Sequence, residues 1–197
     1  MILNDRLKDY NIILASGSPR RQQFIKDLGI EFEIRLKEVE EVYPKRLYKY
    51  EISDYLAQLK SLPHKETLKE NDILITSDTI VWHNEEALGK PRSKEEAMAM
   101  LRSLSGNMHE VITSVCFTTK KIEKTINHIT KVYFKELTED EIEYYVTNYK
   151  PYDKAGGYGI QEWIGQIGII KIEGSYANVV GLPVYEVYKA LNSLVIE

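Results

Sequence analysis

The sequence predicts an α/β fold, and three observations carry that prediction. Short apolar runs typical of strands alternate along the chain with segments whose apolar residues recur at helical spacing. Two helix starts have the capping-box pattern, Ser93 with Glu96 and Thr138 with Glu141. The chain has 197 residues, of which 43% are hydrophobic and 28% charged, enough apolar material for one domain or two small lobes.

The first half of the chain begins with a short buried strand, followed by a helix with clear start and stop signals. Ser18 is a suitable N-cap, Pro19 a suitable first helical residue, and Gly29 a suitable end. Three more elements are expected there: a strand over Phe32–Leu36, a helix over Ile52–Leu59 that ends at Pro63, and a strand over Ile73–Thr76. The first strand is expected over Ile12–Ala15.

The second half continues the alternation of helices and strands. Apolar residues at helical spacing follow both capping boxes, and Pro183 opens a last helix. The residues expected to face inward are Ala97, Met100, Leu101 and Leu104, then Ile142, Tyr145, Val146 and Tyr149, then Val184, Val187, Tyr188 and Leu191. The expected strands are Val111–Thr119, Thr125–Phe134, Gly168–Ile172 and Val179–Leu182.

Composition excludes several classes of protein. The longest apolar runs are about six residues, whereas a membrane helix needs about twenty, and Met1–Tyr10 has no apolar stretch of signal-peptide length. A single cysteine, Cys116, allows neither an internal disulfide nor a cysteine-based zinc cluster. A net charge of −4 gives no general basis for nucleic-acid binding. We therefore expect a soluble protein of the cytoplasm, with neither a membrane nor a nucleic acid as its partner.

The segment from Ser16 to Arg21 has the chemistry of a phosphate site. A buried strand leads through small residues into a helix start, where backbone N–H groups favour an anion. Ser16 and Ser18 add hydroxyl groups, and Arg20 and Arg21 add donors suited to phosphate oxygens. The same pattern is also that of a well-capped surface helix with two solvated arginines.

Acidic residues lie near the ends of two predicted strands. Asp78 directly follows the buried strand Ile73–Thr76, where α/β sheets place their sites, and could bind a metal or accept a proton from water. Glu38–Glu41 could hold a hard divalent cation, or could be a solvated acidic loop. Lys90, between Gly89 and Pro91, could present a point charge to a phosphate.

The segment Asp153–Gln161 has three glycines within four residues. Glycines there allow a close backbone approach or positive φ angles. The spacing does not match the GxGxxG nucleotide fingerprint, and GxxxxGK[ST] is absent from the sequence. A tight connection between a helix and a strand would have the same composition.

Taken in order, these segments resemble the Maf family of nucleoside triphosphate pyrophosphatases. The resemblance runs from Ile13 to about Leu191 and rests on eight short pieces in the family's order. Gly157 stands where the family more often has alanine. The pieces are ILASGSPRR (13–21), EVEE (38–41), LAQLK (56–60), SDTIV (77–81), LGKP (88–91), LRSLSG (101–106), DKAGGYGIQ (153–161) and VVGLPV (179–184).

The resemblance implies a fold and a reaction. The fold is a mixed α/β sheet with two lobes around a central cleft, related to the inosine triphosphatases, in one catalytic domain over residues 1–197. The reaction converts a nucleoside triphosphate and water into the monophosphate and pyrophosphate, with Mg²⁺ or Mn²⁺ as the divalent cofactor. A homodimer is expected only because symmetric dimers are common.

The resemblance also implies roles for residues of this chain. Asp78, Glu41 and Lys90 match catalytic positions, and Glu41 and Asp78 would also hold the metal. Phosphate-binding positions are Ser16, Arg20, Arg21 and Lys60, the last of which follows a variable segment over 43–50. Arg20, Thr79 and Gln161 match the positions that separate the branches of the family, in the pattern of the dTTP/UTP branch.

Two other functions stay open at this point. A 7-methyl-GTP pyrophosphatase would share the reaction, but that branch has Trp, Gln and Glu at the three specificity positions. A non-catalytic nucleotide-binding regulator of cell division would bind through the same residues without turnover. Glu41, Asp78 and Lys90 together argue against pure binding, which does not need all three.

Overall fold

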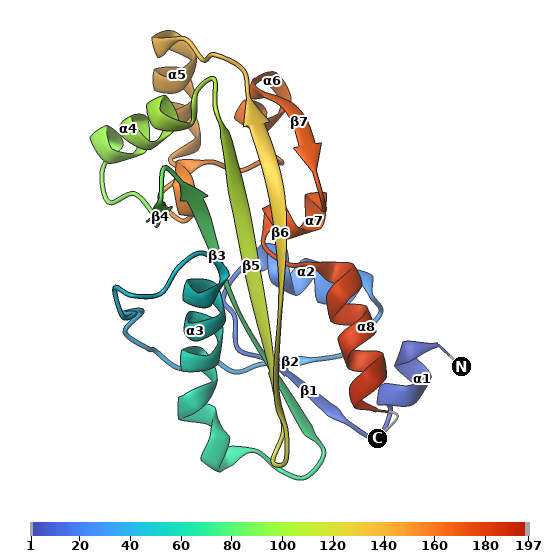
Figure 1. The fold of residues 1–197 in the computed structure, drawn as a ribbon. Coiled ribbons are helices and arrows are strands. Elements are labelled where there is room, and N and C mark those ends of the chain that lie inside the picture. Colours follow the sequence, from blue (N-terminus) through green and yellow to red (C-terminus); the bar gives the residue numbers. More distant parts are fainter. Residues whose placement is uncertain (1, 196–197) are drawn as a thin grey trace. The chain divides into compact units, whose positions relative to one another are not determined.

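The computed structural model describes residues 2–195, which contain a seven-stranded mixed sheet (Figure 1). The strand order is β2-β1-β3-β5-β6-β7, and β4 pairs with β3. β1 pairs in parallel with β2 and β3, whereas β4 is antiparallel to β3 and β7 is antiparallel to β6. The predicted mixed α/β fold is confirmed. The strands are β1 (Asn11–Leu14), β2 (Glu33–Ile34), β3 (Asp72–His83), β4 (Glu86–Leu88), β5 (Met108–Thr118), β6 (Glu123–Phe134) and β7 (Ile169–Glu173).

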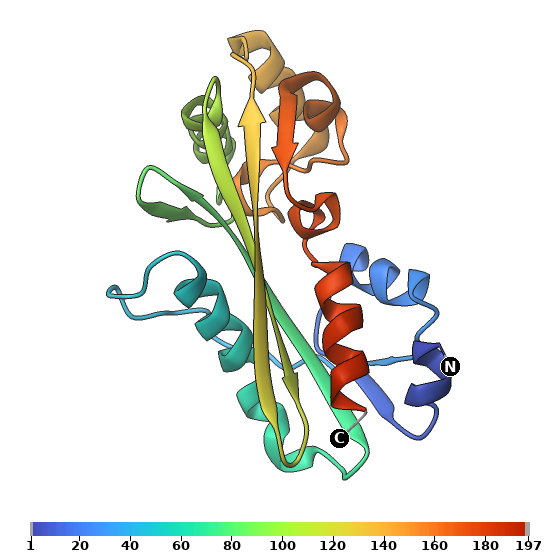
Figure 2. The same ribbon diagram turned by 45° about the vertical axis from the view of Figure 1, so that its right-hand side comes forward.

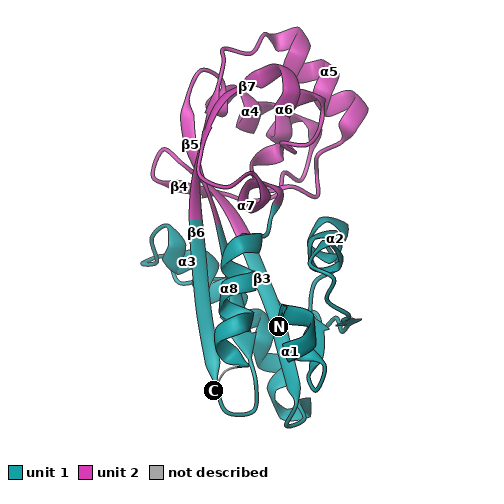
Figure 3. Cartoon of the chain, turned by 90° about the vertical axis from the view of Figure 1, so that its right-hand side faces the viewer, with its two compact units in different colours: residues 1–78, 113–128, 181–197 teal, residues 79–112, 129–180 magenta. Residues whose placement is uncertain are grey.

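The chain divides into two compact units, coloured separately in Figure 3. Unit 1 contains residues 1–78, 113–128 and 181–197, and unit 2 contains residues 79–112 and 129–180. The strands β3, β5 and β6 each contribute residues to both units. The two units agree with the expectation of two lobes, and the cleft between them stays a prediction.

Helices α1, α2 and α8 cover one face of the strands in unit 1. Alternate residues of a strand share a face, so Ile73 and Ile75 of β3 point the same way, into the core beneath these helices. α1 and α8 lie side by side (Figures 1 and 2). The helices are α1 (Leu3–Leu7), α2 (Pro19–Asp27) and α8 (Val184–Leu194), and the buried core residues include Ile12, Leu14, Ile25, Val115, Phe117, Val187 and Leu191.

The other face of β3 in unit 1 meets α3 (Tyr50–Ser61), which continues into a short 3₁₀ helix, η1 (Leu62–Thr67). Thr76 points to this face and donates a hydrogen bond of 2.7 Å from Oγ1 to the carbonyl oxygen of Ala57. Leu74, on the same face, packs with Leu68. This contact between β3 and α3 is what brings Lys60, at the end of α3, beside the strand.

Unit 2 has its own apolar core between the sheet and a group of helices. Leu101 and Tyr145 are fully buried there, together with Phe134 of β6. The helices of unit 2 are α4 (Lys94–Leu104), α5 (Glu139–Tyr149), the 3₁₀ turn η2 (Ala155–Gly157), α6 (Trp163–Gly168) and α7 (Tyr176–Val180). Across residues 2–195, no helix combines the length and the apolar character that crossing a membrane requires.

Several local predictions are confirmed. The Ser18 side chain caps α2 by accepting from the backbone N–H of Arg21, and Gly29 ends that helix with φ of +71°. Thr138 and Glu141 form a complete capping box at the start of α5. These signals involve residues within four positions of each other, so the sequence alone specifies them.

Other local predictions are wrong or incomplete. The strand expected over Val179–Leu182 is wrong, because α7 runs to Val180. Asn178 is buried in α7 and donates from Nδ2 to the carbonyl oxygen of Val111 and to Thr130 Oγ1, both at 3.0 Å, so tertiary contacts override the strand preference of the valines. Three smaller differences remain. β2 is shorter than expected, and helices α1 and α6 are not expected from the sequence. The side chains expected to face inward that are less buried than expected are those of Met100, Tyr149 and Tyr188.

The capping box expected at α4 is only half formed. Ser93 accepts from the backbone N–H of Glu96 at 3.2 Å, as predicted. The Glu96 carboxylate accepts from the backbone N–H of Arg92 at 2.8 Å, one residue earlier than the box requires. The Glu96 carboxylate therefore satisfies the backbone N–H of Arg92 rather than that of the N-cap residue Ser93.

Candidate active site

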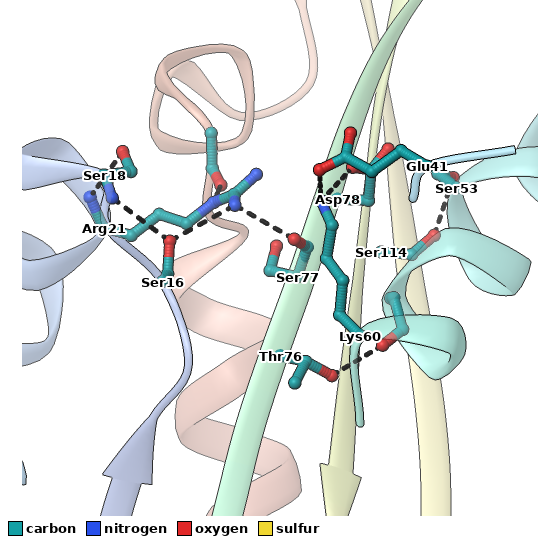
Figure 4. Close-up of polar contacts among 12 residues, drawn as sticks. Ser16, Ser18, Arg21, Glu41, Ser53, Lys60, Thr76, Ser77, Asp78 and Ser114 are labelled. Atoms are coloured by element: carbon teal, nitrogen blue, oxygen red, sulfur yellow. Dashed lines mark hydrogen bonds and ion pairs between the residues drawn. The ribbon is translucent and has the colours of Figure 1, made fainter. Parts of the chain in front are cut away.

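Three charged side chains meet in unit 1 (Figure 4). Lys60 Nζ lies 2.6 Å from Asp78 Oδ1 and 2.9 Å from Glu41 Oε1. Lys60 comes from the end of α3, Asp78 from the middle of β3, and Glu41 from the loop between β2 and α3. The structure thus brings together the two predicted carboxylates and Lys60.

Asp78 does not lie at the end of a strand, as the sequence suggested, because β3 continues without a break from Asp72 to His83. The polar run Thr76–Thr79 looks like a turn in the sequence, yet the buried side chains of Thr76 and Asp78 find partners on α3. The Asp78 side chain is only 9% exposed, whereas that of Glu41 is 46% exposed. Asp78 is therefore the more dependent on Lys60 for compensation of its charge.

A polar network holds α3 against the sheet within unit 1. The hydroxyl groups of Ser53 and Ser114 lie 2.7 Å apart, and Ser114 donates to Asp54 Oδ1 at 2.6 Å. Asn127 of β6 donates from Nδ2 to both oxygens of the same carboxylate, at 3.1 and 3.0 Å. These residues fix the helix that carries Lys60, and they were missed because their partners lie about sixty or more residues away.

Side chains at the start of α2 form hydrogen bonds with one another and with neighbouring backbone groups in this structure. Arg21 donates from Nε to the carbonyl oxygen of Gly181 at 2.9 Å and from Nη1 to that of Ser77 at 3.0 Å. Ser16 Oγ accepts from the backbone N–H of Ser18 at 3.3 Å and from Arg21 Nη1 at 3.5 Å (Figure 4). Arg21 therefore joins three segments of unit 1, and its contact with phosphate stays a prediction.

Electrostatics around Arg21 place it close to the charged cluster. Burial lowers the pKa of the Arg21 guanidinium, and the charge of Asp78 acts in the opposite direction. Arg20, half-buried in the first turn of α2, adds a second positive charge that acts on Arg21, and Glu41 partly offsets it. The charges of Asp78, Arg20 and Glu41 thus all act on Arg21 within unit 1.

The remaining predicted residues belong to unit 2. Thr79 follows Asp78 in β3 and is half-buried, and Lys90 is exposed in the segment after β4. Gln161 is exposed and lines an open groove of about 450 Å³ together with Ile160 and Tyr176. Their expected approach to the substrate stays a prediction.

The glycine-rich segment has the backbone that its composition predicts. Gly156 and Gly157 both have φ of +70°, and a Cβ atom at Gly156 would lie 2.9 Å from Val81 Cγ2. The backbone N–H of Gly156 donates to the carbonyl oxygen of Gly89 at 3.0 Å, which ties this segment to the residue before Lys90. The predicted close backbone approach is confirmed.

The donor set around Lys60 fits a hard divalent cation. Glu41 and Asp78 both contact one ammonium group, so their oxygens already converge on one positive charge. Within residues 2–195, no three side chains of His, Cys, Asp or Glu gather as a potential metal site. Two carboxylates suit Mg²⁺, which usually takes its other ligands from water and substrate phosphates.

The fold places the chain in a known class of mixed α/β proteins. The structure of the Staphylococcus aureus Ham1 protein matches it with a TM-score of 0.52 and 16% sequence identity, over 93% of this chain and 99% of that one. At that identity the likeness shows the fold alone. The family model described as "Maf-like protein" matches residues 11–194, and the chain belongs to the Maf family.

Relatives in several bacteria match over nearly their whole length. A protein of Christiangramia forsetii is 62% identical, over 98% of both chains. A protein of Flavobacterium johnsoniae is 58% identical over 98% of this chain and 100% of its own. A protein of Bacteroides fragilis is 48% identical over 95% of this chain and 98% of its own. All three relatives are named dTTP/UTP pyrophosphatase.

Proposed function

We propose that this protein hydrolyses dTTP and UTP to the nucleoside monophosphate and pyrophosphate. The name shared by relatives up to 62% identical supports this activity. The observation that carries the proposal within the structure is the convergence of Glu41 and Asp78 on Lys60. Such a cluster of opposite charges suits a triphosphate, which needs both cations for its oxygens and a carboxylate for the attacking water.

The reaction makes one bond and breaks one. The oxygen of a water molecule attacks the α-phosphorus, and the bond to the oxygen that bridges the α and β phosphates breaks. The water loses a proton, and pyrophosphate leaves with the electron pair of the broken bond. In this proposal Asp78 orients this water or accepts its proton, and the contact that holds its carboxylate beside Lys60 supports that role.

The positive side chains stabilise the negative charge that moves to the leaving group. Lys60 contacts both carboxylates that would hold the metal, and its ammonium would stabilise the charge of phosphate oxygens bound there. Lys90 adds a positive charge in unit 2. The residue before it, Gly89, accepts a backbone hydrogen bond from Gly156 of the glycine-rich segment. Arg20 and Arg21 of α2 are further candidates, and two donors of Arg21 bind backbone carbonyls in this structure.

Glu41 and Asp78 would hold the divalent cation, Mg²⁺ or Mn²⁺. When bound, the cation neutralises phosphate charge and polarises the phosphorus–oxygen bonds. Asp78 cannot serve fully as a metal ligand and as a base at once, since both roles use the same carboxylate. The greater exposure of Glu41 makes its oxygens the more available to an incoming cation.

Gln161 would recognise the base of the nucleotide by hydrogen bonds from its side-chain amide. Uracil and thymine present an acceptor at O4 and a donor at N3–H, and a side-chain amide can pair with both groups. A carboxylate at this position would repel O4. Gln161 is exposed at an open groove, which leaves its amide accessible to a ligand.

The test is pyrophosphate release with Mg²⁺ or Mn²⁺ from dTTP, UTP, CTP, GTP, 7-methyl-GTP and ITP. We expect kcat/KM to be highest for dTTP and UTP. Faster turnover of 7-methyl-GTP would contradict the proposed substrates but keep the reaction. Tight nucleotide binding without release of pyrophosphate from any substrate would contradict the proposed reaction itself.

A further inference from the structure

A small charged cluster lies beside the amide end of the Gln161 side chain in unit 2. Lys154 Nζ lies 2.7 Å from Asp153 Oδ1 and 2.9 Å from Glu162 Oε1, and the Lys154 side chain is 9% exposed. The second oxygen of Glu162 accepts from the hydroxyl group of Tyr145. The carboxylate of Glu162 is thus held on both oxygens.

The backbone beside Gln161 is held by the same tyrosine. The N–H of Gly159 donates to the hydroxyl oxygen of Tyr145 at 3.0 Å. Tyr145 is fully buried in α5, so its hydroxyl group is a fixed anchor for both Gly159 and Glu162. The segment that carries Gln161 therefore has a defined position within unit 2.

Gly159 leaves the space in which the cluster meets Gln161. A Cβ atom at Gly159 would lie 2.9 Å from Glu162 Cδ, 3.0 Å from Gln161 Nε2 and 3.0 Å from Lys154 Cε. Three side chains thus converge on one point that only glycine leaves open. The nitrogen end of the Gln161 amide is the end that lies there.

We propose that Glu162, held by Lys154 and Tyr145, is a positioning residue that sets the orientation of the Gln161 amide. The cluster has two carboxylates and one ammonium, so it has a net negative charge. Negative charge attracts the amide N–H₂ group and repels the amide oxygen. A flipped amide would turn its oxygen toward the point beside Gly159 on which Glu162 also converges, and the net negative charge of the cluster disfavours that orientation.

A fixed amide orientation has a chemical consequence for the choice of base, given the proposed function in which Gln161 contacts that base. With one N–H of Nε2 directed to the cluster, Oε1 is left to accept from the base, and the second N–H of Nε2 stays available to donate to O4. Uracil and thymine have an N3–H donor for it, whereas the N3 atom of cytosine is itself an acceptor. The cluster therefore favours uracil and thymine nucleotides over cytosine nucleotides, which a freely flipping amide would accept about equally.

The decisive variant is Glu162→Gln, which keeps the shape of the side chain and removes its charge. Its matched control is Glu173→Gln, because Glu173 pairs with Lys171 on the exposed part of the same unit. We expect the UTP/CTP ratio of kcat/KM to fall about tenfold or more in Glu162→Gln, through faster use of CTP, and to stay unchanged in the control. A merely structural role would lower kcat/KM for both nucleotides together and leave their ratio unchanged.

Gly159→Ala gives a second route if Glu162→Gln does not fold. The three atoms nearest to the added Cβ belong to the ends of flexible side chains, so the substitution would displace the Gln161 amide from the cluster. We expect the same loss of UTP/CTP selectivity, with the fold checked by circular dichroism. An unchanged ratio in whichever of the two variants folds would overturn the inference.

A binding measurement separates this inference from the proposed reaction. UTP and CTP analogues with a methylene group in place of the α–β bridging oxygen are titrated into the wild type and the variants by calorimetry. Absence of turnover in the wild type would overturn the proposed function, while a UTP preference in binding that Glu162→Gln removes would still support the inference. Equal binding of both analogues by the wild type would overturn the inference.

Discussion

Replacing Lys60 by methionine removes the cation shared by Glu41 and Asp78 while keeping most of the side-chain volume. The pair with Glu41 contributes little, because that carboxylate is 46% exposed. The pair with Asp78 matters more, because that side chain is 9% exposed. Removing an exposed ion pair costs below about 1 kcal/mol of unfolding free energy, and breaking a fully buried pair costs about 3–5 kcal/mol. The Lys60–Asp78 pair lies between these cases, so we expect a loss of about 2 kcal/mol.

For a chain of this size, that loss lowers Tm by about 4–8 °C, which thermal unfolding followed by circular dichroism would measure. Lys65→Met is the matched control, because Lys65 pairs with Glu123 at a more exposed position of unit 1. Millimolar Mg²⁺ should restore much of the loss in Lys60→Met and raise the Tm of the wild type less, because in the wild type the cation competes with the Lys60 ammonium for the two carboxylates. A Tm no lower than that of the control, or no response to Mg²⁺, would refute the reasoning.

Two further predictions concern stability in unit 2. Gly156→Ala should lower the free energy of unfolding by about 2–4 kcal/mol, because φ is +70° and the new Cβ would lie 2.9 Å from Val81, and urea unfolding that matched the wild type would contradict this. Burial lowers the pKa of His109 to about 3, so the unfolded chain takes up a proton there as the pH falls below about 6.5, while the folded chain does not. Because of His109, the free energy of unfolding should therefore fall by about 2 kcal/mol between about pH 8 and about pH 5. His109→Gln should lose less unfolding free energy than the wild type over that range. Equal losses would contradict the lowered pKa of His109.

Local features of the fold could be predicted because their partners are close in the sequence. Ser18 and Pro19 start α2, and Thr138 and Glu141 start α5, through contacts that span at most three residues. The glycine-rich segment likewise has positive φ angles at Gly156 and Gly157. Such signals depend on the backbone within one turn, which tertiary packing rarely changes.

Features that depend on distant partners could not be predicted from the sequence alone. The polar run around Asp78 looks like a strand end, but Thr76 and Asp78 find partners eighteen to nineteen residues away on α3, so β3 continues through them. The buried Asn178 holds α7 in place against a strand preference. The residues that meet around Lys60 were found by family resemblance, since no short-range pattern places Glu41 beside it.

The Asp54 network shows the same limit for the site. Asp54 accepts from Ser114 and Asn127, which belong to two strands far along the chain, and it fixes the helix that carries Lys60. Nothing in the local sequence distinguishes Asp54 from a solvated acidic residue. Residues that position a site are therefore harder to find from the sequence than those that perform its chemistry.

The role of Asp78 is tested most directly by pyrophosphate release from dTTP and UTP by Asp78→Asn, compared with Asp72→Asn. Asp72 is a buried aspartate of the same strand whose carboxylate accepts from Asn11 and from the backbone N–H of Lys69. Both variants lose a buried charge, but only Asp78 lies in the Lys60 cluster. We predict that Asp78→Asn loses about 10²–10⁴-fold in kcat while Asp72→Asn, measured per folded molecule, stays near the wild type. Near-wild-type turnover by folded Asp78→Asn would contradict the central claim.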